Sequence, residues 1–145
     1  MTRIAAVTGA TGFVGSHVVR RLADSGWQVR LLTRRLPIHP SFAAVPVDAV
    51  IGDLEDATAL RHLTSNADVV IHIAGLIKAR SRAEFFAANS AGTQRLVEIA
   101  ASQQAIPRFM LISTIAAREP GLSDYAASKK AGEDVLMAKA ANMPW

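Results

Sequence analysis

The chain has 145 residues, of which half are hydrophobic and 19% are charged, a balance that excludes a disordered polypeptide. It has no cysteine, which excludes a disulfide framework and a thiolate metal site, and we predict no metal. The net charge of +4 is spread over scattered basic residues, so a phosphate-bearing small molecule explains it as well as a nucleic acid does. We expect a cytoplasmic domain with neither a nucleic-acid nor a membrane partner, because no apolar run reaches the ~20 residues of a membrane span.

Short apolar runs alternate with longer helical stretches along the chain. The predicted strands are Ile4–Thr8, Val29–Thr33, Val47–Ile51, Val69–Ala74 and Phe109–Ser113. The predicted helices are Gly12–Ser25, Asp56–Ser65, Ser81–Gln103 and Ser123–Ala141. Continuously apolar strands are typical of parallel sheets covered on both faces. The alternation predicts right-handed βαβ units, and therefore one α/β domain with a doubly wound parallel sheet in the order 3-2-1-4-5.

A glycine-rich loop follows the first predicted strand directly. Its sequence is Thr8-Gly9-Ala10-Thr11-Gly12-Phe13-Val14-Gly15-Ser16, and an amphipathic helix comes next. Gly9 would make the turn, Gly12 would let a pyrophosphate approach the helix N-terminus, and Gly15 would let helix and strand pack. The strand–loop–helix context favours this interpretation over a glycine-rich turn without a ligand. The residues expected to line the cofactor are Gly9, Thr11, Gly12, Phe13, Val14 and Gly15.

The spacing Gly-x-x-Gly-x-x-Gly after a threonine resembles the loop of extended and atypical short-chain dehydrogenases/reductases, the NAD(P)-dependent epimerase/dehydratase family. The resemblance runs from Thr2 to Trp145, with the motifs in the family's order. It implies a Rossmann domain over residues 1–145 that binds a nicotinamide cofactor. It also implies hydride transfer between that cofactor and a small-molecule substrate with a hydroxyl or carbonyl group.

The second strand predicts which cofactor is used. No Asp or Glu lies between Ser25 and Val47, where a site for NAD places the acidic residue that accepts the ribose 2′-OH. The strand ends instead in Thr33-Arg34-Arg35. A guanidinium pairs well with a 2′-phosphate. We therefore expect NADP(H) rather than NAD, with Arg34 as the first candidate and Arg35 as the second; the alternative is that both are solvated loop charges.

Three further segments match the family's cofactor site. Asp53 and Leu54 follow the third strand, where the resemblance implies contact with the adenine; Asp53 could equally form the turn into the next helix. Ala74 and Gly75 close the fourth strand and would let the ribose and phosphate pass closely. Asn89 matches an asparagine that helps to order the active site. His72 receives no chemical role, because a packed core histidine explains it equally well.

Tyr125 and Lys129 are expected to carry the chemistry. They are four residues apart, so they share one face of the last predicted helix. A free tyrosine has a pKa near 10 and is a poor base at neutral pH, and a nearby ammonium lowers that pKa by favouring the phenolate. Lys129 can also hold the ribose hydroxyls. A hydroxyl at the end of strand five would complete the set: the resemblance favours Thr114, with Ser113 as the alternative, and either could merely cap a helix or loop.

These residues predict an oxidoreductase, although epimerases and dehydratases use the same transient oxidation. A non-catalytic dinucleotide-binding, sensing or assembly module is a second possibility. The resemblance also implies a homodimer through helices 81–103 and 123–141. The chain stops at Asn142-Met143-Pro144-Trp145, where the family's sixth strand would begin. We therefore expect a truncated chain that lacks the C-terminal substrate-binding part, has little turnover alone and leaves strand five as an open edge.

Overall fold

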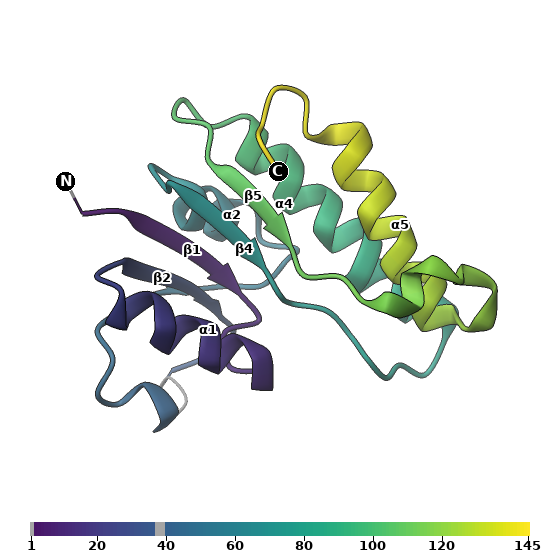
Figure 1. Cartoon of the computed structure of the whole chain (residues 1–145), viewed down its shortest axis with the longest axis horizontal. Helices are drawn as coiled ribbons and strands as arrows, with labels where there is room; N and C mark the ends of the chain where they lie inside the picture. Colours follow the sequence, from purple (N-terminus) through teal and green to yellow (C-terminus); the bar gives the residue numbers. More distant parts are fainter. Residues whose placement is uncertain (1, 37–39) are drawn as a thin grey trace.

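The computed structural model describes residues 2–36 and 40–145. One sheet of five parallel strands crosses the molecule in the order β3-β2-β1-β4-β5 (Figure 1), so the predicted topology is confirmed. The strands are β1 (Ile4–Thr8), β2 (Gln28–Thr33), β3 (Val47–Ile51), β4 (Val69–His72) and β5 (Arg108–Leu111). The α-helices are α1 (Phe13–Asp24), α2 (Ala57–Thr64), α3 (Arg82–Phe86), α4 (Gly92–Ala101) and α5 (Asp124–Lys139).

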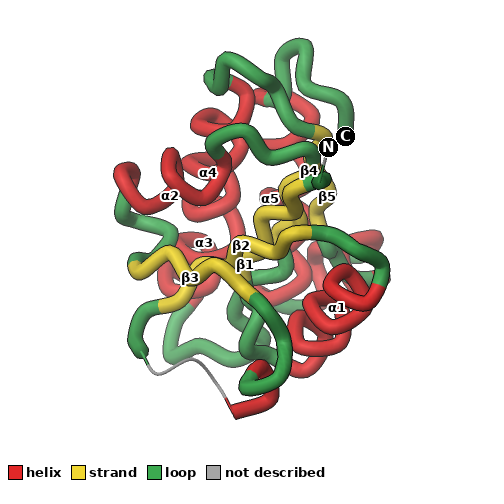
Figure 2. The backbone as a smooth tube through the Cα atoms, turned by 90° about the vertical axis from the view of Figure 1, so that its left-hand side faces the viewer, coloured by secondary structure: helices red, strands yellow, loops and turns green. Residues whose placement is uncertain are grey.

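Two hydrophobic cores cover the two faces of the sheet. One lies under α2, α4 and α5 and contains Leu60, Leu96 and Leu136. The other lies under α1 and contains Val19, Leu31 and further strand residues. Figure 2 shows α1 on the opposite side of the strands from α2 and α4. In the part of the chain that the structure describes, no helix has the length and apolar character needed to cross a membrane.

The predicted helix Ser81–Gln103 is divided into three segments. Ser81 caps α3 by accepting a hydrogen bond from the N–H of Glu84 (3.2 Å), as the capping pattern predicts. A π-helical turn, Ala87–Ala91, then separates α3 from α4. This turn lies directly against α5: a Cβ on Gly132 would lie 2.5 Å from the carbonyl oxygen of Asn89. Such single-turn bulges are frequent at functional sites.

The predicted strand ends at Ala74 and Ser113 are two residues too long. β4 ends at His72, and the N–H of Ala74 bonds instead to the Thr8 hydroxyl (3.2 Å). β5 ends at Leu111, because the chain leaves the sheet there to reach a 3₁₀ turn at Ile115–Arg118. A second 3₁₀ turn, Pro120–Leu122, leads into α5.

The outer edge of β5 is less open than the sequence predicts. The N–H of Phe109 donates to the carbonyl of Pro144 (2.8 Å), and Met143 is buried. The last residues of the chain therefore lie beside the start of β5. Met110, Met137 and Trp145 stay about half exposed next to it.

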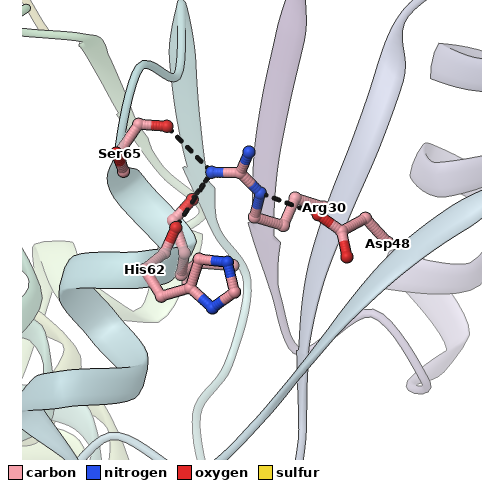
Figure 3. A network of polar contacts seen from close by, with 5 residues as sticks. Arg30, Asp48, His62 and Ser65 are labelled. Carbon is pink, nitrogen blue, oxygen red and sulfur yellow. Dashed lines mark hydrogen bonds and ion pairs between the residues drawn. The ribbon is translucent and has the colours of Figure 1, made fainter.

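Arg30 on β2 fixes α2 to the sheet (Figure 3). Its Nη1 donates to the carbonyls of His62 (2.9 Å), Leu63 and Ser65 (2.8 Å) at the C-terminal end of α2. Its Nε pairs with Asp48 of β3 at 3.1 Å. A guanidinium here satisfies the last helical carbonyls and complements the helix dipole. Arg30 thus joins β2, β3 and the C-terminal end of α2.

Candidate active site

The glycine loop turns from β1 into α1 without room for side chains at two positions. Gly9 has φ +69°, and a Cβ there would lie 2.5 Å from the backbone nitrogen of Ala74. A Cβ on Gly15 would lie 2.0 Å from the carbonyl oxygen of Gly9. Gly12 differs, because its nearest neighbour, the Gly9 oxygen, would be 3.4 Å away. Packing therefore requires Gly9 and Gly15, whereas Gly12 faces open space.

The N-terminus of α1 is built to receive an anion. Gly12 is its N-cap, its side-chain-free position supplies no cap to the first N–H groups of the helix, and the first turn contains no acidic residue. The first N–H groups of a helix and the positive end of its dipole attract phosphate oxygens. Thr11, Phe13 and Val14 are exposed beside this turn, with 83% of Phe13 accessible.

The ends of β2 and β3 place the predicted adenosine contacts near one another. Arg34 and Arg35 are exposed beyond β2, and the Thr33 hydroxyl donates to the Arg35 carbonyl (3.1 Å). Oδ1 of Asp53 accepts the N–H groups of Glu55 (2.8 Å) and Asp56, so this carboxylate forms the turn before α2. That structural role does not exclude the predicted one. Among the described residues, Oδ2 of Asp53 has no partner and can accept another hydrogen bond.

His72 links β1 and β4 to α4 through two buried threonines. Its Nδ1 is 2.6 Å from the Thr8 hydroxyl and its Nε2 is 3.0 Å from the Thr93 hydroxyl. Thr93 donates its proton to the Asn89 carbonyl (2.9 Å), so it accepts from Nε2–H, and Nδ1 accepts from Thr8. Burial, together with the charge of Lys129, lowers the pKa of His72 to about 3. A neutral histidine of fixed tautomer therefore holds this network.

Asn89 connects the loop after β4 to α5. Its Oδ1 accepts from the N–H of Leu76 (2.7 Å), and its Nδ2 donates to the Leu76 carbonyl (2.9 Å) and to the Ser128 hydroxyl (3.0 Å). A Cβ on Gly75 would lie 2.8 Å from that Oδ1. The structure thus places Asn89 between the predicted ribose contact, Gly75, and the helix that carries Tyr125.

Tyr125 and Lys129 lie in the first half of α5. Ser123 caps this helix by accepting the N–H of Ala126 (3.0 Å), and the Tyr125 ring packs against Phe85 with centroids 6.1 Å apart. Lys129 is only 8% exposed, and its Nζ donates to the Ile112 carbonyl (2.7 Å). Burial lowers the pKa of Lys129, and the charge of Glu133 opposes that shift.

The two candidate hydroxyls after β5 have different partners. Ser113 donates its proton to Oε1 of Glu133 at 2.5 Å. Thr114 accepts the N–H of Ala116 (3.3 Å) as the cap of the 3₁₀ turn. A hydroxyl has one proton to donate. Within the described residues the proton of Thr114 has no acceptor, so Thr114 can donate to a bound oxygen while Ser113 is already engaged.

Sequence reasoning missed two groups at this site. Glu133 was not singled out, although its position four residues after Lys129 places both on one helix face. Thr8 and Thr93, the partners of His72, are 64 and 21 residues away from it, and no local pattern connects them.

Comparisons with known proteins show the family and the fold. The family described as "NAD dependent epimerase/dehydratase family" matches residues 5–143. The chain is 50% identical over 135 residues to a ceramide reductase of Caulobacter vibrioides, covering 93% of this chain and 42% of the relative. It is 33% identical to a 4-hydroxy-2-methyl-3-oxo-4-farnesyl-3,4-dihydroquinoline-1-oxide ketoreductase of Stigmatella aurantiaca, covering 79% of this chain and 34% of the relative.

Solved structures share the fold. The structure of MoeE5 in complex with UDP-glucose and NAD superposes with a TM-score of 0.80 at 29% identity, covering 97% of this chain and 50% of that one. The chain thus spans half or less of the length of each of these proteins. The shared part covers nearly all of this chain.

Proposed function

This chain belongs to the NAD dependent epimerase/dehydratase family, and from that premise we propose that it is an NAD(P)-dependent reductase for a carbonyl group on a large apolar substrate. The observation that carries the proposal is the convergence of three elements at the carboxyl ends of the parallel strands. The uncapped N-terminus of α1, the hydroxyl of Thr114 and the Tyr125–Lys129 face of α5 all follow these strand ends. Ligands of open α/β sheets bind at this edge.

The residues present fit a dinucleotide. Gly12 leaves space for a pyrophosphate at the start of α1, and a Cβ on Gly75 would fill the space next to Asn89 and lie 3.9 Å from the Lys129 nitrogen. Arg34 and Arg35 favour NADP(H), because in the described residues neither guanidinium is in an ion pair and each can meet a 2′-phosphate. The nicotinamide supplies the hydride when bound.

The side chains at the other end supply the proton. Tyr125 would donate its phenolic proton to the carbonyl oxygen of the substrate, which would become a hydroxyl when the carbonyl is reduced. Thr114 donates a hydrogen bond to the same oxygen, which favours the developing negative charge. The Lys129 ammonium, fixed by the Ile112 carbonyl, orients the ribose and favours the phenolate that Tyr125 becomes.

Apolar side chains around this site support an apolar substrate. Ile77 after β4 is 76% exposed, and Ile115 and Leu122 after β5 are 80% and 79% exposed. Both sequence relatives described above carry the name of a reductase, one for ceramide and one for a farnesylated ketone. A nucleotide-sugar substrate has less support, because its many hydroxyls need polar partners that these three residues do not offer.

The test separates binding from turnover. Calorimetry measures the affinity for NADP⁺ and NAD⁺, and we expect NADP⁺ to bind more tightly. Oxidation of NADPH is then followed with a long-chain ketone of the ceramide type, a short water-soluble ketone and UDP-glucose, and we expect the long-chain ketone to react fastest.

The matched variants are Tyr125→Phe and Lys129→Met. Removal of the acid should lower the turnover by about 10²-fold or more while the affinity for NADP⁺ changes little for Tyr125→Phe. Lys129→Met should lower both quantities, because the ammonium also contacts the ribose. If Tyr125→Phe keeps the full rate, Tyr125 is not the acid; if no ketone reacts while NADP⁺ still binds, the result favours a dinucleotide-binding module instead.

A further inference from the structure

Two consecutive residues after β5 hold two side chains of α5. The Ile112 carbonyl accepts the Lys129 ammonium at 2.7 Å, and the Ser113 hydroxyl donates to the Glu133 carboxylate at 2.5 Å. Lys129 and Glu133 are one helical turn apart and face the same strand end. Figure 1 shows the segment after β5 running alongside this part of α5. Within the described residues, the ammonium and the carboxylate are thus each fixed by the segment after β5 without forming a direct ion pair with each other.

The surroundings of Lys129 make a nearby negative charge necessary. Lys129 is buried, with 8% of the residue exposed, and burial disfavours the charged form of its side chain. His72 faces it from β4 but is neutral, so it supplies no compensating charge. Tyr125 lies one helical turn before it on α5. In the described part of the chain, Glu133 is the carboxylate whose charge opposes the effect of burial on Lys129.

We propose that Glu133, held in place by Ser113, is a positioning residue that keeps the buried Lys129 ammonium protonated and available to the cofactor and to Tyr125. The inference rests on the proposed function only in the role given to Lys129, which is to contact the ribose and to favour the phenolate of Tyr125. It gives Ser113 a task different from that of Thr114: Ser113 orients the carboxylate, and Thr114 contacts the substrate oxygen. Neutral Lys129 would neither stabilise the phenolate nor donate as strongly to ribose hydroxyls.

The test is a titration of Lys129 that needs neither cofactor nor turnover. The chain contains only four lysines, namely Lys78, Lys129, Lys130 and Lys139. Their ¹³Cε signals can be followed from pH 6 to pH 11 in chain labelled with [¹³C]lysine, with the Lys129 signal assigned by its loss in Lys129→Arg. Glu133→Gln removes the charge but keeps the volume and an oxygen that can accept from Ser113.

A matched control lies one residue further along the same helix. Asp134 forms an exposed ion pair with Lys130, also at the i,i+4 spacing. We expect Glu133→Gln to lower the midpoint of the Lys129 titration and Asp134→Asn to leave that midpoint where it is. Ser113→Ala should lower it by less than Glu133→Gln does, because the carboxylate stays nearby but loses its anchor.

Two outcomes would overturn the inference. One is an unchanged Lys129 midpoint in Glu133→Gln; the other is an equal shift in Glu133→Gln and Asp134→Asn, which would indicate a general effect of helix charge. If the spectrum of Glu133→Gln shows an unfolded chain, Ser113→Ala decides, and an unchanged midpoint there counts against the proposal. A failed ketone assay would affect the proposed function alone, since the titration is made on the free protein.

Discussion

The two ends of the candidate site are built in opposite ways. The phosphate end consists of nine consecutive residues, Thr8–Ser16. Its backbone N–H groups face the expected phosphate, and its glycines matter because a side chain at those positions would meet other atoms or fill the space for the ligand. The proton-transfer end consists of side chains from separate elements: Asn89 bonds to Ser128 across 39 residues and Ser113 bonds to Glu133 across 20 residues. The first end is therefore sensitive to any added atom, and the second to a change of charge or hydrogen-bonding group.

The largest effect is expected at the phosphate end, from Gly15→Ala. The new Cβ would lie 2.0 Å from the Gly9 oxygen and 2.7 Å from the Ala10 Cα, and both are backbone atoms that cannot move without displacing the β1–α1 turn. We expect a loss of about 3 kcal/mol or more in the free energy of unfolding, as for other overpacked positions. Urea denaturation measures it.

Gly121→Ala is the matched control for this change. Nothing lies within 4 Å of a Cβ at that position, so its stability should stay within roughly 0.5 kcal/mol of the parent chain. Equal stabilities of the two variants would show that the β1–α1 turn adapts to a side chain, and the contrast between the two ends of the site would then disappear.

The second effect, from Gly12→Val, separates binding from folding within the same loop. The nearest atom to a Cβ at this position is 3.4 Å away, so the fold tolerates it, but the branched side chain would occupy the space in front of the α1 N-terminus. We expect the affinity for NADP⁺ to fall at least about tenfold, or about 1.4 kcal/mol, with only a small change in the unfolding midpoint. If calorimetry shows that the folded Gly12→Val chain binds NADP⁺ as tightly as the parent chain does, the pyrophosphate does not bind at this turn.

The contrast between the two ends also explains what the sequence could predict. The strand order, the glycine loop and the face shared by Tyr125 and Lys129 follow from local patterns, because each depends on residues within about two helical turns or on apolar runs. The π turn at Ala87–Ala91 does not follow, because the periodicity of residues 81–103 is compatible with one uninterrupted helix. The turn depends on contacts of Asn89 with distant segments.

The different hydrogen-bond partners of Ser113 and Thr114, which follow β5, could not be predicted from the sequence either. Sequence alone ranked Thr114 above Ser113 by resemblance, but it offered no physical reason, since the two hydroxyls are adjacent and chemically alike. The structure shows a difference between them, because Glu133 of α5 accepts the hydrogen bond that the Ser113 hydroxyl donates. Likewise, His72 could be interpreted as a packed histidine, but its two threonine partners and its tautomer could not be predicted without the fold.

The last effect, a dependence of stability on pH, is expected between the two ends, where His72 joins Thr8 of the phosphate end to Thr93 beside Asn89. Its pKa is lowered from 6.5 to about 3 in the folded chain, so the unfolded chain binds a proton at a higher pH than the folded chain does. This contribution to stability is complete above pH 6.5 and is lost progressively as the pH falls from 6.5 towards 3. The slope is at most about 1.4 kcal/mol per pH unit for one group.

Urea denaturation between pH 7 and pH 5 measures this slope while most carboxylates stay ionised. His72→Gln should lower the stability at every pH, because one of the two threonine contacts is lost, but it should also flatten the dependence on pH. His62→Gln is the control, since the side chain of His62 is exposed, and it should keep the parent slope. A slope in His72→Gln as steep as in the parent would mean that another group takes up the proton. The neutral imidazole would then be a packing element between the two ends rather than the source of their acid sensitivity.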